Sequence, residues 1–338
     1  VLPLTRTLLV LMETPPEILD GAYDFISIVF AGLVIFLLLY LQNCLIRALG
    51  DSKTPTIFLG ITLGVNVALE PVAILVLDWG IPGAALATVV SQAIGALLFF
   101  LYIRRRVHAL HTRRADWIPN TAVLMAHLRM GLPMALQSSV IAIGAIILQV
   151  ALNNLGALPV AAFAATQKID AVAVMPMLSF GYAMAAYTAQ NYGAQKYERI
   201  RAGVRACLRM SIAFAVGMGI LLIAFGTHVL ALFVGADAAG AEEVIAYGQT
   251  YLVVNGSMYA ILAVLLVYRN VLQGLGQSVI PTIAGILELV MRAAAAIFLC
   301  SSLGFLGACM ANPLAWIGAG IPVVLAYVWT EKTLRQTA

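Results

Sequence analysis

Hydrophobic residues gather in long stretches along the chain, and short polar segments separate them. About 20 consecutive apolar residues are enough for a helix to cross the hydrocarbon core of a bilayer. Stretches of that kind run roughly over 22–45, 56–77, 84–103, 131–153, 160–188, 207–226, 244–268, 279–300 and 306–329. The pattern therefore predicts nine complete membrane-spanning helices, and Val1 to Met12 is typical of the end of a tenth.

The composition supports this interpretation. Of 338 residues, 62% are hydrophobic and only 10% are charged, whereas a soluble domain has about 25% charged residues. The four cysteines lie mostly within apolar stretches, which favours neither a disulfide framework nor a zinc site. We therefore expect an all-α polytopic membrane protein, and we exclude the soluble, disordered and disulfide-rich secreted classes.

The charges alternate from one loop to the next. One set of loops is basic, and the opposite set is acidic and contains no Lys or Arg. The basic set contains Arg47, Lys53, Arg104, Arg105, Arg106, Arg113, Arg114, Lys196, Arg199, Arg201, Arg205, Arg269, Lys332 and Arg335. By the positive-inside rule these loops and the C-terminus are cytoplasmic in a multi-pass protein of the cell (inner) membrane. The net charge of +4 is thus a topology signal, and we expect no nucleic-acid partner.

Two segments occur twice. Leu49 to Ile57 (LGDSKTPTI) matches 275–283 (LGQSVIPTI), and Gly80 to Ala87 (GIPGAALA) matches 304–311 (GFLGACMA). Such internal repeats are typical of transporters. The repeat predicts two copies of a six-helix unit that face the same way.

The expected division has three parts. Residues 1–103 form the remainder of an N-lobe (part of helix three and helices four to six), 104–130 form a basic cytoplasmic linker, and 131–338 form a C-lobe (helices seven to twelve). The matching segments that begin at Leu49 and Leu275 are 275 − 49 = 226 residues apart. By this offset the first copy begins upstream of Val1, so we predict an N-terminally truncated chain.

Several segments resemble one known family. Residues 47–55 (RALGDSKTP), 66–71 (NVALEP) and 79–88 (WGIPGAALAT) resemble helices four to six of the multidrug and toxic compound extrusion (MATE) transporters, and 161–170 (AAFAATQKID) and 189–194 (AQNYGA) resemble their second lobe. The resemblance implies a two-lobed bundle of twelve helices and no enzyme activity. It implies a proton- or sodium-coupled antiporter that exports drugs and organic cations by alternating access. We expect a monomer in the bilayer that acts on small amphipathic substrates, with no cofactor besides the coupling ion and no metal.

The resemblance also implies a cation or proton site in the N-lobe. Its positions match Asn43, Asn66, Glu70 and Thr88, and the family's helix-one acid would lie upstream of Val1. Glu70 departs from the Asp that is usual at this place. The likeness is DinF-like rather than NorM-like, because the helix-seven acid of NorM-like transporters is replaced near Val140 and the 244–268 helix contains no acid.

The residues themselves support part of this site. Asn66 and Glu70 are four residues apart and share a helix face, and Pro71 leaves the carbonyl of Val67 without its helical partner. Ionisable groups inside a membrane are costly, so they are functional candidates. Glu288 and Arg292 have the same spacing, which favours an intrahelical ion pair, with proton coupling or substrate contact as the alternative.

A polar cavity in the C-lobe is a further candidate, and polar packing between helices remains an equal alternative. The candidates for a substrate cavity or for coupling in this lobe are Gln137, Asn153, Gln167, Lys168, Asp170, Glu288 and Arg292.

Three other functions remain as rivals. A flippase for lipid-linked sugars would need a cationic central cavity, for which Arg6, Lys168 and Arg292 are the candidates. An intramembrane enzyme is disfavoured because the chain has no HExxH or GxSxG motif. A non-transporting truncated remnant is the third alternative.

Overall fold

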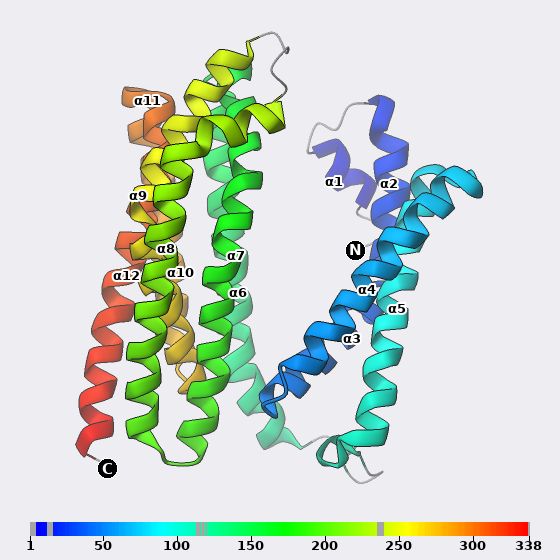
Figure 1. The fold of residues 1–338 in the computed structure, drawn as a ribbon, viewed down its shortest axis with the longest axis vertical. Coiled ribbons are helices and arrows are strands. Elements are labelled where there is room, and N and C mark those ends of the chain that lie inside the picture. Colours follow the sequence, from blue (N-terminus) through cyan, green and yellow to red (C-terminus); the bar gives the residue numbers. More distant parts are fainter. Residues whose placement is uncertain are drawn as a thin grey trace. The chain divides into compact units, whose positions relative to one another are not determined.

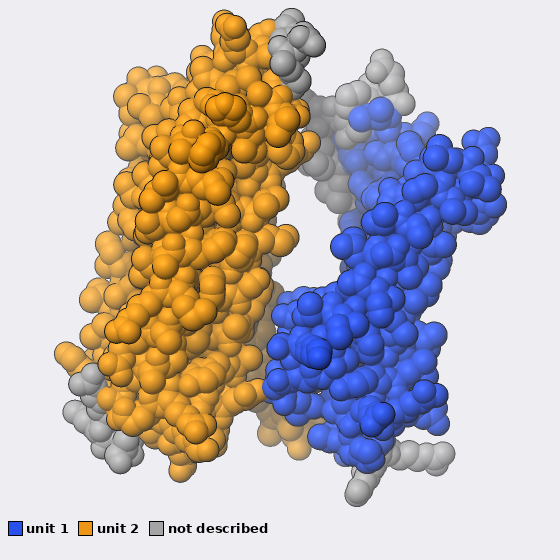
Figure 2. Space-filling model, viewed as in Figure 1, with its two compact units in different colours: residues 1–119 blue, residues 120–338 orange. Residues whose placement is uncertain are grey.

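The apolar stretches form helices in the computed structural model, which describes residues 5–11, 16–112, 116, 118, 120–234 and 240–336 (Figure 1). The described part of the chain contains no β-strand. It separates into two compact units, residues 1–119 and residues 120–338 (Figure 2). The predicted all-α membrane architecture is therefore confirmed.

Unit 1 is built around α5 (Gly80–Arg106). This helix contacts α2 (Pro16–Ala31), α3 (Leu33–Ala48) and α4 (Lys53–Pro71). The unit also contains α1 (Thr5–Leu11), a π-helical turn η2 (Val72–Val76) and a 3-10 turn η3 (His108–Leu110). Close approach between α4 and α5 depends on Gly95, because a Cβ there would lie 2.3 Å from the Thr62 hydroxyl.

Unit 2 is built around α9 (Ala241–Gly274). It contacts α7 (Ala157–Gly193), α8 (Tyr197–Val234) and α12 (Phe305–Gln336). The helix α10 (Val279–Ala294) packs on α6 (Thr121–Asn153) and α12, and it continues through a π-helical turn η5 (Ala295–Leu299) into α11 (Cys300–Leu303). Most of the buried apolar side chains of the described residues lie in this unit.

Eight described helices are long and apolar enough to cross a membrane, or up to nine if the bent pair α2 and α3 counts as one span. The stretch 22–45, expected as one helix, bends by 50° at Gly32. At this position α5 approaches closely, since a Cβ on Gly32 would lie 2.7 Å from the Val89 side chain. The predicted end of a further helix at 1–12 is α1, and residues 1–4 and 12 lie outside the described residues.

Several helices are longer than the apolar stretches that predicted them. The helix α6 begins at Thr121, so the last ten residues of the expected linker 104–130 are helical. The helix α9 runs to Gly274 and includes Arg269, which we expected in a cytoplasmic loop. Hydropathy marks only the part of a helix that lies in hydrocarbon, whereas the backbone hydrogen bonds continue beyond it.

The internal repeat is visible in the backbone. The turns that follow α3 and α9 have the same hydrogen bonds, from Asp51 N to Ile46 O at 3.3 Å and from Gln277 N to Leu272 O at 2.9 Å. Gly50 and Gly276 have φ of 94° and 80°, in the left-handed region that glycine adopts without steric cost. Helix α4 and helix α10 each continue into a π-helical turn, η2 and η5. The two copies therefore share local geometry as well as sequence.

Candidate functional site

The predicted N-lobe residues lie on α3, α4 and α5. The Asn66 side-chain amide donates to the Thr88 hydroxyl at 3.5 Å, and that hydroxyl donates to the carbonyl of Ala84 at 3.0 Å. Glu70 lies one helical turn after Asn66 and is half-buried. Within the described residues no hydrogen bond or ion pair occupies its carboxylate. Asn66 and Thr88 thus join α4 to α5, and we call these two residues and Glu70, one turn further along α4, the polar strip.

Asn43 has a different partner. It accepts a hydrogen bond of 2.7 Å from Arg47 Nε, four residues later on the same helix. No hydrogen bond among the described residues joins it to Asn66, Glu70 or Thr88. This contact follows from helical spacing, since residues four apart face each other.

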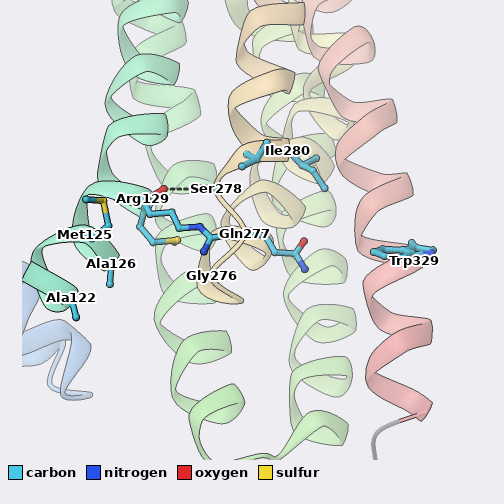
Figure 3. A pocket seen from close by; sticks show the side chains of 11 residues that line it. Ala122, Met125, Ala126, Arg129, Gly276, Gln277, Ser278, Ile280 and Trp329 are labelled. Atoms are coloured by element: carbon cyan, nitrogen blue, oxygen red, sulfur yellow. Dashed lines mark hydrogen bonds between the residues drawn. The ribbon is translucent and has the colours of Figure 1, made fainter.

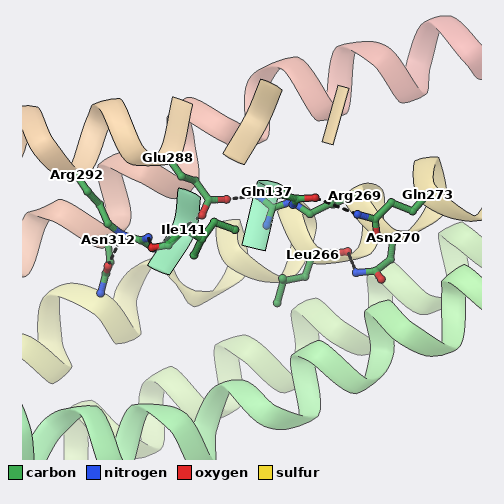
Figure 4. A network of polar contacts seen from close by, with 9 residues as sticks. All are labelled: Gln137, Ile141, Leu266, Arg269, Asn270, Gln273, Glu288, Arg292 and Asn312. Atoms are coloured by element: carbon green, nitrogen blue, oxygen red, sulfur yellow. Dashed lines mark hydrogen bonds and ion pairs between the residues drawn. The ribbon is translucent and has the colours of Figure 1, made fainter. Parts of the chain in front are cut away.

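The C-lobe contains a buried cluster of charges (Figure 4). Glu288 on α10 lies between two arginines. Arg269 on α9 donates a hydrogen bond to one carboxylate oxygen, and Arg292 Nη2 lies 3.8 Å from the other. The expected contact between Glu288 and Arg292 is present, but the closer partner is Arg269. Sequence reasoning missed Arg269 as a site residue because a basic residue at the end of an apolar stretch is also typical of a loop.

Polar neighbours extend this cluster toward α7. Arg292 donates to Asn312 Oδ1 at 3.1 Å and to the carbonyl of Ile141 at 3.4 Å, and the amide of Asn312 donates to the Tyr251 hydroxyl at 3.2 Å. The Tyr259 hydroxyl donates to the Asp170 carboxylate, with which Tyr251 also interacts. A chain of side-chain contacts thus connects α7, α9, α10 and α12.

The charged residues of this cluster, Arg269, Glu288, Arg292 and Asp170, line a cavity of about 600 Å³ within unit 2, together with Asn312. Of the seven residues predicted for a substrate cavity or for coupling in the C-lobe, four line it: Gln167, Asp170, Glu288 and Arg292. Its remaining wall is largely apolar, with Phe163 and Trp316 as its aromatic residues. Pockets of 300–1,000 Å³ with a few placed polar groups are typical of small-molecule sites.

The other three residues lie elsewhere. Lys168 lines a separate cavity of about 430 Å³ between α7, α8 and α9. Gln137 accepts a hydrogen bond of 3.1 Å from Gln273, and Asn153 accepts one of 3.0 Å from Gln149. These two are polar contacts within and between helices, the alternative that the sequence left open.

A larger cavity of about 810 Å³ lies at the start of α6, beside the turn between α9 and α10 (Figure 3). Arg129 is its charged residue, and Trp329 on α12 and Met125 give it an apolar side. The Ser278 hydroxyl donates to the carbonyl of Arg129 at 3.2 Å, which fixes this turn against α6. None of the predicted site residues lines it, so the cavity around Arg292 is the stronger candidate.

A repeated helical bundle that buries ionisable residues inside membrane-spanning helices is the architecture of a secondary transporter. The MatE family model matches residues 1–72 and 133–298, and the chain belongs to this family. The predicted MATE resemblance is confirmed, and the family is one of transporters and not of enzymes.

Similarity to curated multidrug resistance proteins supports this family assignment. The chain is 27% identical over 275 residues to the probable multidrug resistance protein YpnP of Bacillus subtilis, covering 81% of this chain and 60% of YpnP. It is 28% identical over 236 residues to the probable multidrug resistance protein YoeA of the same organism, covering 68% and 51%. The chain thus spans between half and three fifths of the length of these relatives.

Solved structures share the fold. A multidrug resistance MATE family transporter in an outward-facing conformation aligns with a TM-score of 0.89 at 21% identity, covering 99% of this chain and 74% of that one. A MOP superfamily transporter from Pyrococcus furiosus, described as having a binding pocket of reverse polarity, aligns with a TM-score of 0.88 at 21% identity and the same coverage.

Proposed function

We propose that this chain exports drugs and other small amphipathic molecules by cation-coupled antiport. Membership of the MatE family carries this proposal, together with the names of the relatives, which are multidrug resistance and multidrug export proteins. Those names favour drug export over the flippase for lipid-linked sugars. The large apolar area of the two lobes suits substrates that partition into the bilayer.

We place ion coupling on the strip of Glu70, Asn66 and Thr88. A carboxylate inside a membrane is costly unless a partner neutralises it, and no partner occupies Glu70 in the described structure. A proton or a sodium ion would supply the missing positive charge, and the amide and hydroxyl oxygens beside it would add ligands for sodium. Asn43 would join this site only after releasing Arg47.

The coupling sequence follows from alternating access. An ion enters from outside and binds at Glu70, the lobe rearranges and substrate leaves outward. The cavity then faces the cytoplasm, the ion is released and new substrate enters. This scheme requires the basic loops and the C-terminus to be cytoplasmic, and a C-terminal fusion that fluoresces only in the cytoplasm tests that orientation.

Efflux of ethidium from cells expressing this chain tests the proposal. We expect efflux to follow an imposed proton or sodium gradient and to disappear in Glu70→Gln. The matched control is Glu242→Gln, which removes an exposed acid in the first turn of α9. Unchanged efflux in Glu70→Gln would show that Glu70 takes no part in ion coupling. A lack of gradient-driven efflux in the unmodified chain, with the protein present in the membrane, refutes the transport function.

A further inference from the structure

Arg292 is a buried cation that shares its counter-charge with a second arginine. It is only 8% exposed, yet its closest carboxylate oxygen, on Glu288, is 3.8 Å away, beyond hydrogen-bond distance. That carboxylate already accepts a hydrogen bond from Arg269. The acceptors that Arg292 does have, Asn312 and the carbonyl of Ile141, are neutral. Two guanidinium groups thus share one carboxylate.

Asp170 does not neutralise the excess positive charge of the two arginines directly. Its carboxylate accepts a hydrogen bond from the Tyr259 hydroxyl, and Tyr251 lies close enough to interact with it as well. Tyr251 and Asn312 stand between Asp170 and Arg292 in the chain of contacts, so no ion pair joins the two among the described residues. Two buried cations that share one carboxylate keep an excess positive charge, which is unfavourable, and binding an anion relieves that cost.

An anion has room beside Arg292, because the guanidinium lines the cavity of about 600 Å³ together with Asn312 and Trp316. Arg269 lines it as well, and its Nε is buried without an acceptor in the described structure. The planar guanidinium group matches the two oxygens of a carboxylate. Phe163 and the leucines of α9 give the rest of the wall an apolar surface.

We propose that this C-lobe cavity binds the carboxylate of an amphiphilic organic acid at Arg292, with Arg269 and Asn312 beside it and the apolar part of the molecule against Phe163 and Trp316. Amphiphilic organic acids differ in charge from the organic cations that the family resemblance implies as substrates. Only the further step, that the bound acid is a transported substrate, rests on the proposed function. Binding itself can be measured without transport.

Two dyes that differ only in a carboxylate test this site. Rhodamine B carries a free carboxylate, and its ethyl ester carries none on the same ring system. Binding of each to the purified full chain in detergent is measured by fluorescence anisotropy. A charge-assisted contact predicts that the acid binds about 10-fold or more tightly than the ester. In Arg292→Gln the two dyes should bind equally, because the acid alone loses its partner.

Control variants separate binding from structure. Arg209→Gln removes an exposed cation of α8 that does not line the cavity, and it should leave the preference for the acid unchanged. If the arginines served only to hold the helices together, Arg292→Gln would lower the melting temperature without changing the preference. Equal binding of acid and ester by the unmodified chain, or a preference that survives Arg292→Gln, overturns the proposal.

A second variant covers the case in which Arg292→Gln does not fold. Ala145 on α6 lines the cavity and is exposed, so Ala145→Trp would fill the space while keeping every charge. We expect it to weaken binding of the acid at least about 10-fold. Unchanged binding in Ala145→Trp would place the dye elsewhere and also overturn the proposal. Failure of the efflux experiment with intact acid binding would reject transport and keep the site.

Discussion

Helices α8 and α9 pack so closely at one point that a single methyl group should separate them. A Cβ added at Gly219 in α8 would lie 2.3 Å from the backbone carbonyl oxygen of Gly256 in α9. Ordinary carbon–oxygen contacts between helices are about 3.3–3.6 Å, so Gly219→Ala creates an overlap of roughly 1 Å. The clash falls on backbone, which cannot rotate away as a side chain would.

The same helix offers a matched control. Gly217 is exposed, and apart from its own stretch of helix no atom lies within 4 Å of a Cβ placed there. Both substitutions gain about 1 kcal/mol from the better helix propensity of alanine. Only Gly219→Ala incurs the overpacking cost of about 1–3 kcal/mol. The difference between the two variants therefore isolates the close packing of α8 on α9.

Thermal unfolding in detergent measures this difference. A thiol-reactive fluorophore reports unfolding because Cys207, Cys300 and Cys309 are buried, while the exposed Cys44 contributes to the baseline. One kcal/mol shifts the melting temperature of a domain of 150–250 residues by about 2–4 °C. We expect Gly219→Ala to melt about 2–12 °C below Gly217→Ala. Melting temperatures within about 1 °C of each other would refute the packing argument.

Three further predictions concern charge and turns. Glu288→Gln leaves two buried guanidinium groups without a carboxylate and should destabilise the chain by about 3–5 kcal/mol in thermal unfolding. The double variant Glu288→Gln/Arg269→Gln should recover part of this lost stability, because it also removes one of the unpaired cations. Additive losses of stability in the two single variants would contradict the ion pair between Glu288 and Arg269. Hydrogen bonding from Thr54 lowers the pKa of Asp51 in the folded protein. The ionised carboxylate therefore stabilises the fold at pH values above its unfolded pKa of about 3.9. This stabilisation is lost as the pH falls through the lower pKa of the folded state. Asp51→Asn should therefore be less stable at neutral pH and equally stable at about pH 2 in unfolding measured against pH. Gly276→Ala, at φ 80°, should cost about 1–2 kcal/mol in the same unfolding assay, and an unchanged melting temperature would argue against the left-handed turn.

The fold was largely predictable because its main determinants are local. Apolar stretches define the membrane-spanning helices, and the repeated LG and GxxG segments mark turns whose glycines have positive φ at Gly50, Gly276, Gly80 and Gly304. The bend at Gly32 was not predictable, because it depends on how closely α5 approaches.

The site was predictable only in part, because its contacts join distant segments. The pairing of Glu288 with Arg292 follows from their spacing on one helix, but the closer contact to Arg269 comes from a different helix and has no local signal. Lys168 and Asp170 were expected in one cavity, yet they line two. Residues two apart on a helix do not face each other, so the sequence itself contained the reason for their separation.

The repeat assigns different chemistry to equivalent places in the two lobes. Asn66 on α4 corresponds to Arg292 on α10, and Glu70 corresponds to Ala296. The unpartnered acid of one lobe is thus replaced by alanine in the other, and the neutral amide by a cation. Glu70 lies two residues before the π-helical turn η2 and Ala296 lies within η5, and such backbone irregularities are frequent at functional sites. An acid suits a coupling cation and an arginine suits a carboxylate, so the substitutions favour ion coupling in the first lobe and substrate binding in the second. If that division is correct, Glu70→Gln should abolish gradient-driven efflux and keep the preference for the acid dye, whereas Arg292→Gln should remove that preference.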